Sequence, residues 1–231
     1  MIYRLRNLYE NVFQENKLDQ RYFSCIKEEN VDCLNEIFKS RLKETGFVGS
    51  FFSGSLGDRG YIYNRAEQNG IWTSRNRETA EEYATMGGNA DGVIRSVALK
   101  FESPLDLRPL GVQSDTDTVR NFLKESGVEL PEMYYEAFQS EIEYEEQDTW
   151  FVYSIIDGRN WKADRKLAID VIKSAGYDSM ILSDTHYKTQ SDSYVLFDSS
   201  QVKLLNLITK GDDGNIIPIS HRLTDSPDIR Y

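Results

Sequence analysis

The chain of 231 residues has little of what metal sites and membrane spans require. Its two cysteines, Cys25 and Cys33, and its two histidines, His186 and His221, do not stand at a known zinc spacing, so we expect no metal. We expect both cysteines to be partly buried free thiols in a reducing compartment, because free cysteine is among the most buried residue types. No run of about 18 apolar residues occurs, so we expect no membrane span.

The sequence also lacks a basic excess and an apolar leader. The formal net charge is −11, whereas a protein that binds duplex nucleic acid normally presents a basic face. We therefore expect a protein or small-molecule partner rather than nucleic acid. Residues 1–7 are not followed by the apolar segment of a signal peptide, so we expect a cytoplasmic location.

Hydrophobic and aromatic residues are plentiful, at 39% and 12% of the chain, which is enough for the core of one large domain. Short apolar runs bounded by Gly, Ser, Asn and Asp predict strands, and longer runs with helical periodicity predict helices. These strands do not alternate one for one with helices. The pattern predicts an α+β fold with a split mixed or antiparallel sheet, flanking helices and a helical N-terminal preface, and not a doubly wound fold.

We expect three parts along the chain. Residues 1–46 form the helical preface, which Gly46 can end. Residues 47–210 form the main domain, with an insertion-like helical region at about 111–165. Residues 211–231 form an extended C-terminal tail that begins with a hairpin-like turn.

The most informative stretch is Gly70–Ala84, which predicts a short strand, a turn and a helix. Asn76 can cap the helix, and Glu78 suits its positive first turn. Trp72 on the strand and Tyr83 on the helix stand eleven residues apart and can clamp a flat ring between them. Two ordinary core aromatics would give the same pattern.

Two other stretches belong with this unit: Phe51-Phe52-Ser53-Gly54-Ser55 upstream, and Ser193-Tyr194-Val195-Leu196-Phe197-Asp198 with Gln201-Val202-Lys203 downstream. Together the three stretches resemble the ADP-ribosyltransferase fold, in particular the ADP-ribosyltransferase-like domains in polyvalent proteins of phages and mobile elements. Such domains show an aromatic-His-Gly-Ser/Thr strand, a Gly-Ile-Tyr-Phe-Thr…Tyr-Ala unit and a Glu-Tyr-Val-Val-Phe-Asp strand. Gly176-Tyr177-Asp178 resembles the Gly-Tyr-Asp-Gly turn of the family.

The resemblance implies an enzyme that uses NAD as its substrate, transfers mono-ADP-ribose to a host protein and releases nicotinamide. It implies that the backbone of Gly54 holds the carboxamide, that Trp72 and Tyr83 stack on the nicotinamide ring, and that small hydroxyl side chains contact the ribose or shape the pocket. These hydroxyl residues are Ser53, Ser55, Thr73 and Ser74.

The chain departs from the family at the catalytic positions. Ser53 stands where the family has His, Trp72 where it has Tyr, and Ser193 where it has Glu. Asp192 or an acid from residues 141–148 could substitute for the missing Glu, but in a regular strand Asp192 would point to the other face.

The same residues leave other interpretations open. A fold that has lost its chemistry could instead act as a protein-binding inhibitor, for instance of host defence, or as a module that binds an NAD derivative. Ser53–Ser55 also suits a plain tight turn, and Asp192 suits an exposed loop carboxylate. We expect Lys203 to be a surface charge at a strand end and His186 to be a solvent-exposed loop residue.

Overall fold

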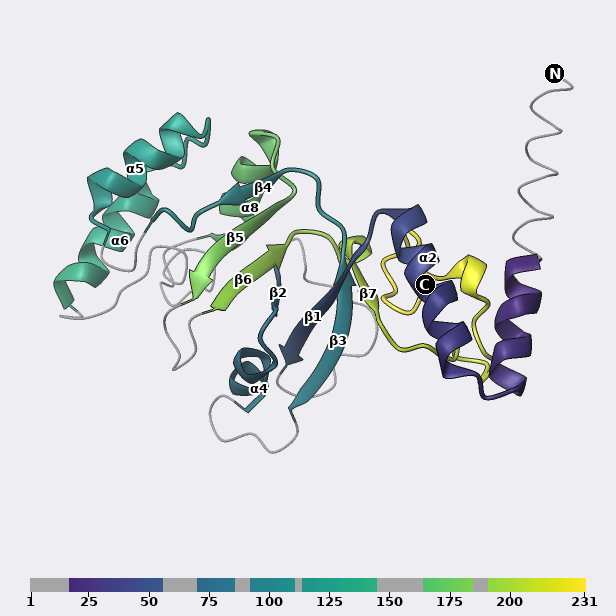
Figure 1. Cartoon of the computed structure of the whole chain (residues 1–231). Helices are drawn as coiled ribbons and strands as arrows, with labels where there is room; N and C mark the ends of the chain where they lie inside the picture. The colour runs from purple at the N-terminus through teal and green to yellow at the C-terminus, as the bar shows by residue number, and fades with distance from the viewer. Residues whose placement is uncertain (1–16, 56–69, 86–91, 111–113, 145–163, 185–190) are drawn as a thin grey trace, which may run out of the picture.

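One seven-stranded sheet organises the protein (Figure 1). The computed structural model describes residues 17–55, 70–85, 92–110, 114–144, 164–184 and 191–231. The strands are β1 (Val48–Ser55), β2 (Ile71–Ser74), β3 (Val93–Leu99), β4 (Pro104–Asp106), β5 (Ser179–Asp184), β6 (Ser191–Leu196) and β7 (Val202–Leu204). Their order across the sheet is β4-β5-β6-β2-β1-β3-β7, with β4 and β5 parallel and the other neighbours antiparallel. The predicted mixed sheet of an α+β fold is confirmed.

Several helices begin or end at residues that commonly cap helices. They are α2 (Val31–Thr45), α4 (Arg77–Thr85), α5 (Thr116–Glu125), α6 (Glu132–Tyr144) and α8 (Arg165–Ser174), with short 3₁₀ turns η2 (Ser199–Gln201) and η3 (Ile219–His221). The side chains of Asn30, Asp115 and Asp164 accept backbone N–H groups at the starts of α2, α5 and α8. Gly46, at φ +76°, ends α2 as expected.

The sheet is split between β1 and β2. These strands pair at Phe52 opposite Ser74, whereas β2 and β6 pair at four positions and β1 and β3 at six. Continued in the same register, Gly54 would lie opposite Trp72, but pairing between the two described strands ends before that point. We call this place the β1–β2 junction. The predicted split therefore lies between the strands that carry the family-like motifs.

Side chains from the two faces of the sheet enter different cores because neighbouring residues of a strand point in opposite directions. Met180, Leu182 and Val195 pack with residues of α5, α6 and α8, and we call their side of the sheet the helix face. Ile181 and Tyr194 point the other way, into a core with residues of β1, β3 and β7. Figure 1 shows α5 and α6 beyond the β4 edge of the sheet.

The C-terminal segment packs against the N-terminal helices beyond the other edge of the sheet (Figure 1). Ile219 and Leu223 are buried among residues of α2 and of the helical segment before it. Tyr22 donates a hydrogen bond of 2.7 Å to the carbonyl of Leu207, and Asp19 accepts two from Ser220. The bridge between residues 210 and 216 agrees with the hairpin-like turn, and within residues 211–231 the side chains of Ile217, Ile219, Leu223 and Ile229 are buried.

The cysteine prediction is wrong. Cys25 and Cys33 form a disulfide, with their Cα atoms 5.9 Å apart. The reason is the turn between two helical segments: Asn30 caps α2, and Glu29 adopts a positive φ of 53°, so the chain reverses between the two cysteines. Over the described ranges, no helix is both long and apolar enough to cross a bilayer.

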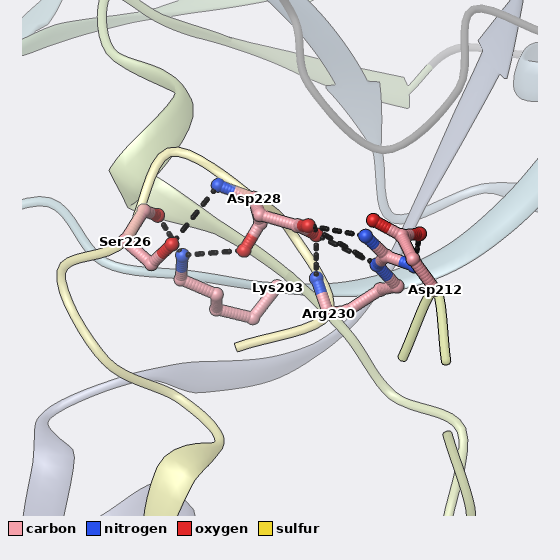
Figure 2. A network of polar contacts seen from close by, with 5 residues as sticks. All are labelled: Lys203, Asp212, Ser226, Asp228 and Arg230. Atoms are coloured by element: carbon pink, nitrogen blue, oxygen red, sulfur yellow. Dashed lines mark hydrogen bonds and ion pairs between the residues drawn. The ribbon is translucent and has the colours of Figure 1, made fainter. Parts of the chain in front are cut away.

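The surface-charge prediction for Lys203 is also wrong, because its side chain is only 1% exposed. Its ammonium group donates hydrogen bonds to the backbone carbonyls of Ser226 and Asp228, and Arg230 forms ion pairs of 2.6 Å with Asp228 and Asp212 (Figure 2). This network fixes the end of the chain against β7. The sequence could not reveal it, because the partners lie more than twenty residues further along the chain.

The buried ammonium group makes stability depend on pH. Burial lowers the pKa of Lys203 to about 8, although Asp228, Asp225 and Asp198 oppose this shift. Between that value and the ordinary lysine pKa, the unfolded chain binds more protons, so the free energy of unfolding should rise with pH. We expect a gain of about 1.5 kcal/mol between pH 8 and 9.5, measured by urea unfolding. Lys203→Met should flatten this slope; an equal slope in the variant would contradict the assignment.

Candidate functional site

The predicted strand–turn–helix unit is present, with β2 leading through a tight turn into α4. The amide oxygen of Asn76 accepts the backbone N–H of Glu78 at 2.9 Å, as the predicted cap requires. The rings of Trp72 and Tyr83 have their centroids 6.3 Å apart, with 41° between their planes. The unit therefore brings the two aromatic side chains together across the gap between β2 and α4.

The two rings do not yet form an open slot. A ring held between two others needs them about 7–8 Å apart and parallel, since carbon atoms meet at about 3.5–4.0 Å. The observed separation is shorter and the planes are tilted. A flat ligand could enter only after Trp72 or Tyr83 turned aside.

Gly54 allows α4 to lie directly on β1. A Cβ atom at this position would stand 1.9 Å from the carbonyl oxygen of Ala80 and 3.1 Å from the amide nitrogen of Ala84. Gly92, just before β3, has the same role, with its Cβ position 2.0 Å from the carbonyl oxygen of Ala84. The glycines thus explain how α4, and Tyr83 with it, is held close to the junction. Carboxamide binding by Gly54 stays a prediction.

The strand register divides the other expected site residues between the two faces. Ser74 and Ser193 are opposite each other on β2 and β6, on the helix face with Trp72. The residues on the opposite face are Ser53, Ser55 and Thr73, all at most 5% exposed. Thr73 donates to the carbonyl of Tyr194, and Arg95 donates to the hydroxyl of Ser55 at 3.5 Å. The structure brings together Gly54, Trp72, Ser74, Tyr83 and Ser193.

Asp192 belongs to the opposite face as well, because β6 is regular and Asp192 precedes Ser193. Its carboxylate forms an ion pair of 3.1 Å with Arg108, which also pairs with Asp106 at 2.6 Å. The bonds to Arg108 hold the pKa of Asp106 below its usual range, and both carboxylates raise the pKa of Arg108. Asp192 therefore points away from Trp72 and has its charge compensated. The side chains of residues 141–148 and of His186 lie outside the described part.

A cluster of hydroxyl groups on the helix face was not found from the sequence. Ser191 of β6 lies 3.2 Å from the hydroxyl of Ser74 and 2.9 Å from that of Thr79 of α4. The hydroxyl of Ser74 also accepts the backbone N–H of Asn76 at 3.1 Å. The cluster ties α4 to β2 and β6, and only the strand register could have predicted it.

Glu82 of α4 is a further residue that the sequence did not indicate. Its Oε2 atom is buried and has no hydrogen-bond partner among the described residues. The rest of the side chain is partly exposed. A buried carboxylate oxygen without a partner is costly to the fold, so it requires an explanation.

Two other family-like residues have structural roles. The carboxylate of Asp178 accepts the backbone N–H groups of Glu102 and Ser103 at 2.6 and 3.2 Å, which holds the start of β4 beside β5. The amide oxygen of Gln201 accepts the backbone N–H groups that follow β6, at 3.1 and 2.9 Å. Its amide nitrogen donates to the carbonyl of Asp178. Within the described ranges, no group of three or more His, Cys, Asp or Glu side chains could hold a metal ion.

Comparison with known proteins gives one family. The model of the family described as ADP-ribosyltransferase in polyvalent proteins matches residues 49–207. None of the curated proteins compared with the chain matches it. A solved structure described as the crystal structure of an anti-CRISPR protein is 16% identical over 65% of this chain and 91% of its own, with a TM-score of 0.32.

Proposed function

The chain belongs to the family of ADP-ribosyltransferases in polyvalent proteins, and we propose that it transfers mono-ADP-ribose from NAD to a host protein in the cytoplasm. Its source would then be a phage or another mobile element. The observation that supports this proposal best is the β1–β2 junction. There Gly54 and Trp72 lie on two strands that have stopped pairing, and Tyr83 lies beside Trp72.

Transfer of ADP-ribose from NAD requires few protein groups. The bond between ribose C1′ and the nicotinamide nitrogen breaks, its electron pair leaves with nicotinamide, and positive charge develops on the ribose, as in glycoside cleavage. Trp72 and Tyr83 would stack on the leaving ring and hold it in place. The backbone of Gly54 would pair with the carboxamide, and Ser74 and Ser193 would contact the ribose. We leave Ser53, Ser55, Thr73 and Asp192 out of this set, because they point to the other face.

Labelling with NAD tests the proposal. The full chain is incubated with a host lysate and with NAD that is labelled in its adenylate part. The variants Trp72→Ala and Tyr83→Ala are incubated in separate, parallel reactions. Each variant should label proteins about tenfold more slowly, since an aromatic pair contributes about 0.5–1.5 kcal/mol beyond its buried area. Phe23→Ala is the matched control, because Phe23 is an aromatic side chain that is 40% exposed and contacts the ring of Tyr22 in the N-terminal helical segment. Equal labelling by all four proteins would contradict the assignment of the rings.

The alternative is a fold that has lost its chemistry and acts by binding a protein or an NAD derivative. The observation in its favour is that Trp72 and Tyr83 contact each other and that serine occupies two catalytic positions, Ser53 and Ser193. A thermal shift separates the two functions: NAD at about 100 times its Kd should stabilise the protein by about 2.7 kcal/mol. If NAD neither labels proteins nor raises the Tm of the chain, a protein-binding role is favoured. If NAD raises the Tm but no protein is labelled, binding of an NAD derivative is favoured.

A further inference from the structure

Helix α4 carries a carboxylate that could supply the negative charge that Ser193 lacks. We infer that Glu82 is a catalytic residue whose carboxylate faces the ribose of NAD and takes the role that a strand glutamate has elsewhere in the family; this inference depends on the proposed function. Ser193 cannot carry a charge, and the carboxylate of Asp192 is held by Arg108 on the other face.

The contacts around α4 show which way Glu82 points. Ala80 lies over β1, Tyr83 contacts Trp72 of β2, and Thr79 contacts Ser191 of β6. Viewed down the helix axis, Ala80, Tyr83 and Thr79 follow one another around the helix. The next side chain in that direction belongs to Glu82, which is three residues after Thr79 in the sequence. The side chain of Glu82 therefore lies on the side of α4 toward β6.

The direction of helical side chains adds a second constraint. A side chain in a helix leans toward the helix N-terminus and covers the turn before its own Cα atom. For Glu82 this is the turn that contains Thr79, whose hydroxyl meets Ser191 at 2.9 Å. The carboxylate is thus directed to the end of α4 next to β6, where Ser193 lies on the same face two residues after Ser191.

The unpaired Oε2 atom of Glu82 distinguishes this residue from Glu81 on the same helix. Glu81 forms an ion pair of 2.7 Å with Arg77 on the exposed side of α4. Oε2 of Glu82 is buried, and among the described residues it has no partner. A buried carboxylate oxygen without a partner costs free energy in the unliganded protein, and a ligand that donates a hydrogen bond to it would remove that cost.

In the proposed role, Glu82 stabilises positive charge and remains a carboxylate throughout the reaction. As the C1′–N bond breaks, nicotinamide leaves as a neutral molecule with the electron pair, and the ribose becomes a cation at C1′ and the ring oxygen. The Glu82 carboxylate would accept a hydrogen bond from a ribose hydroxyl and stabilise this cation. The acceptor then forms a bond to C1′ and releases its proton to water, and Glu82 ends in its starting state.

The test compares Glu82→Gln with Glu81→Gln on the same helix. We expect Glu82→Gln to lower kcat for labelling about 100-fold at saturating NAD, with KM changed only a few-fold, because the charge acts in the transition state. Its Tm without NAD should equal or exceed that of the wild type. Glu81→Gln should label at the wild-type rate. Glu82→Asp keeps the charge on a shorter stem and should label faster than Glu82→Gln.

The outcomes separate this inference from the function it depends on. Wild-type activity with an equally active Glu82→Gln would overturn the role of Glu82 and leave the proposed function standing. A large fall in the Tm of Glu82→Gln, with labelling reduced only in proportion to the folded fraction, would also overturn it, because the carboxylate would then be structural. A wild-type chain that labels nothing would overturn both.

Discussion

Gly54→Ala should destabilise the fold by about 3 kcal/mol or more, a large part of the stability of a domain. The added Cβ atom would stand 1.9 Å from the backbone oxygen of Ala80, a contact that only a shift of the whole helix can relieve. Because α4 also carries Tyr83 and Glu82, such a shift would change the candidate site. We therefore expect both a lower Tm and loss of the NAD-dependent thermal shift.

Gly49→Ala is the matched control, since Gly49 lies in the same strand. A Cβ atom there would be 3.6 Å from the nearest atom, a methyl group of Leu42, which is ordinary contact. This variant should be neutral or more stable by up to about 1 kcal/mol, because alanine restricts the unfolded chain. Urea unfolding of both variants gives the comparison. Equal stabilities would show that α4 is not in close contact with β1 in solution.

Local features of the fold could be predicted from the sequence. The unit from Gly70 to Ala84 is continuous in the chain, and its strand, its Asn76 cap and its two aromatic side chains follow from short-range periodicity and capping. The element pattern predicted a split sheet, but the position of the split could not be predicted, because no local pattern shows where β1 and β2 stop pairing.

Features that depend on contacts between distant segments could not be predicted. In the sequence, Lys203 resembles a surface lysine at the end of a strand. Its burial depends on the carbonyls of residues 226 and 228, which are distant in the chain. Cys25 and Cys33 look like two buried thiols until the helical turn between them is known. The burial of the Glu82 carboxylate oxygen could not be predicted for the same reason, since it depends on how α4 lies on the sheet. Asp192 was expected as a substitute for the missing Glu on the condition that the chain before Tyr194 is irregular; β6 is regular there, so Asp192 points to the other face.

Arg222 should be the most important side chain for the packing of the C-terminal segment. It is 1% exposed, and it donates hydrogen bonds to the carbonyls of Leu204 and Leu207 at 3.0 and 3.2 Å. Its guanidinium carbon lies 4.7 Å from the ring centroid of Phe38 in α2. Burial lowers its pKa, with Tyr22 opposing the shift, and among the described residues no carboxylate forms an ion pair with it.

We expect Arg222→Ala to destabilise the protein by about 3–5 kcal/mol, because it removes a large buried side chain and its hydrogen bond to the buried carbonyl of Leu204, whereas the carbonyl of Leu207 keeps the hydroxyl of Tyr22 as a donor. Arg120→Ala is the control. Arg120 makes an equally well-formed bidentate contact with Glu132, at 2.5 and 2.7 Å, and also lies over the ring of Tyr135, but its side chain is 38% exposed. Its removal should cost about 1 kcal/mol or less.

Arg222→Met separates the volume of the side chain from its hydrogen bonds. Methionine fills much of the same space but donates to neither carbonyl, so its stability should fall between those of the wild type and Arg222→Ala. Arg222 contacts α2 and the segment after β7, away from the β1–β2 junction, so all three arginine variants should label proteins at the wild-type rate at temperatures where they are folded. Lost labelling in a folded Arg222→Met variant would show that the N-terminal helices and the C-terminal segment control the site as well as the stability of the fold.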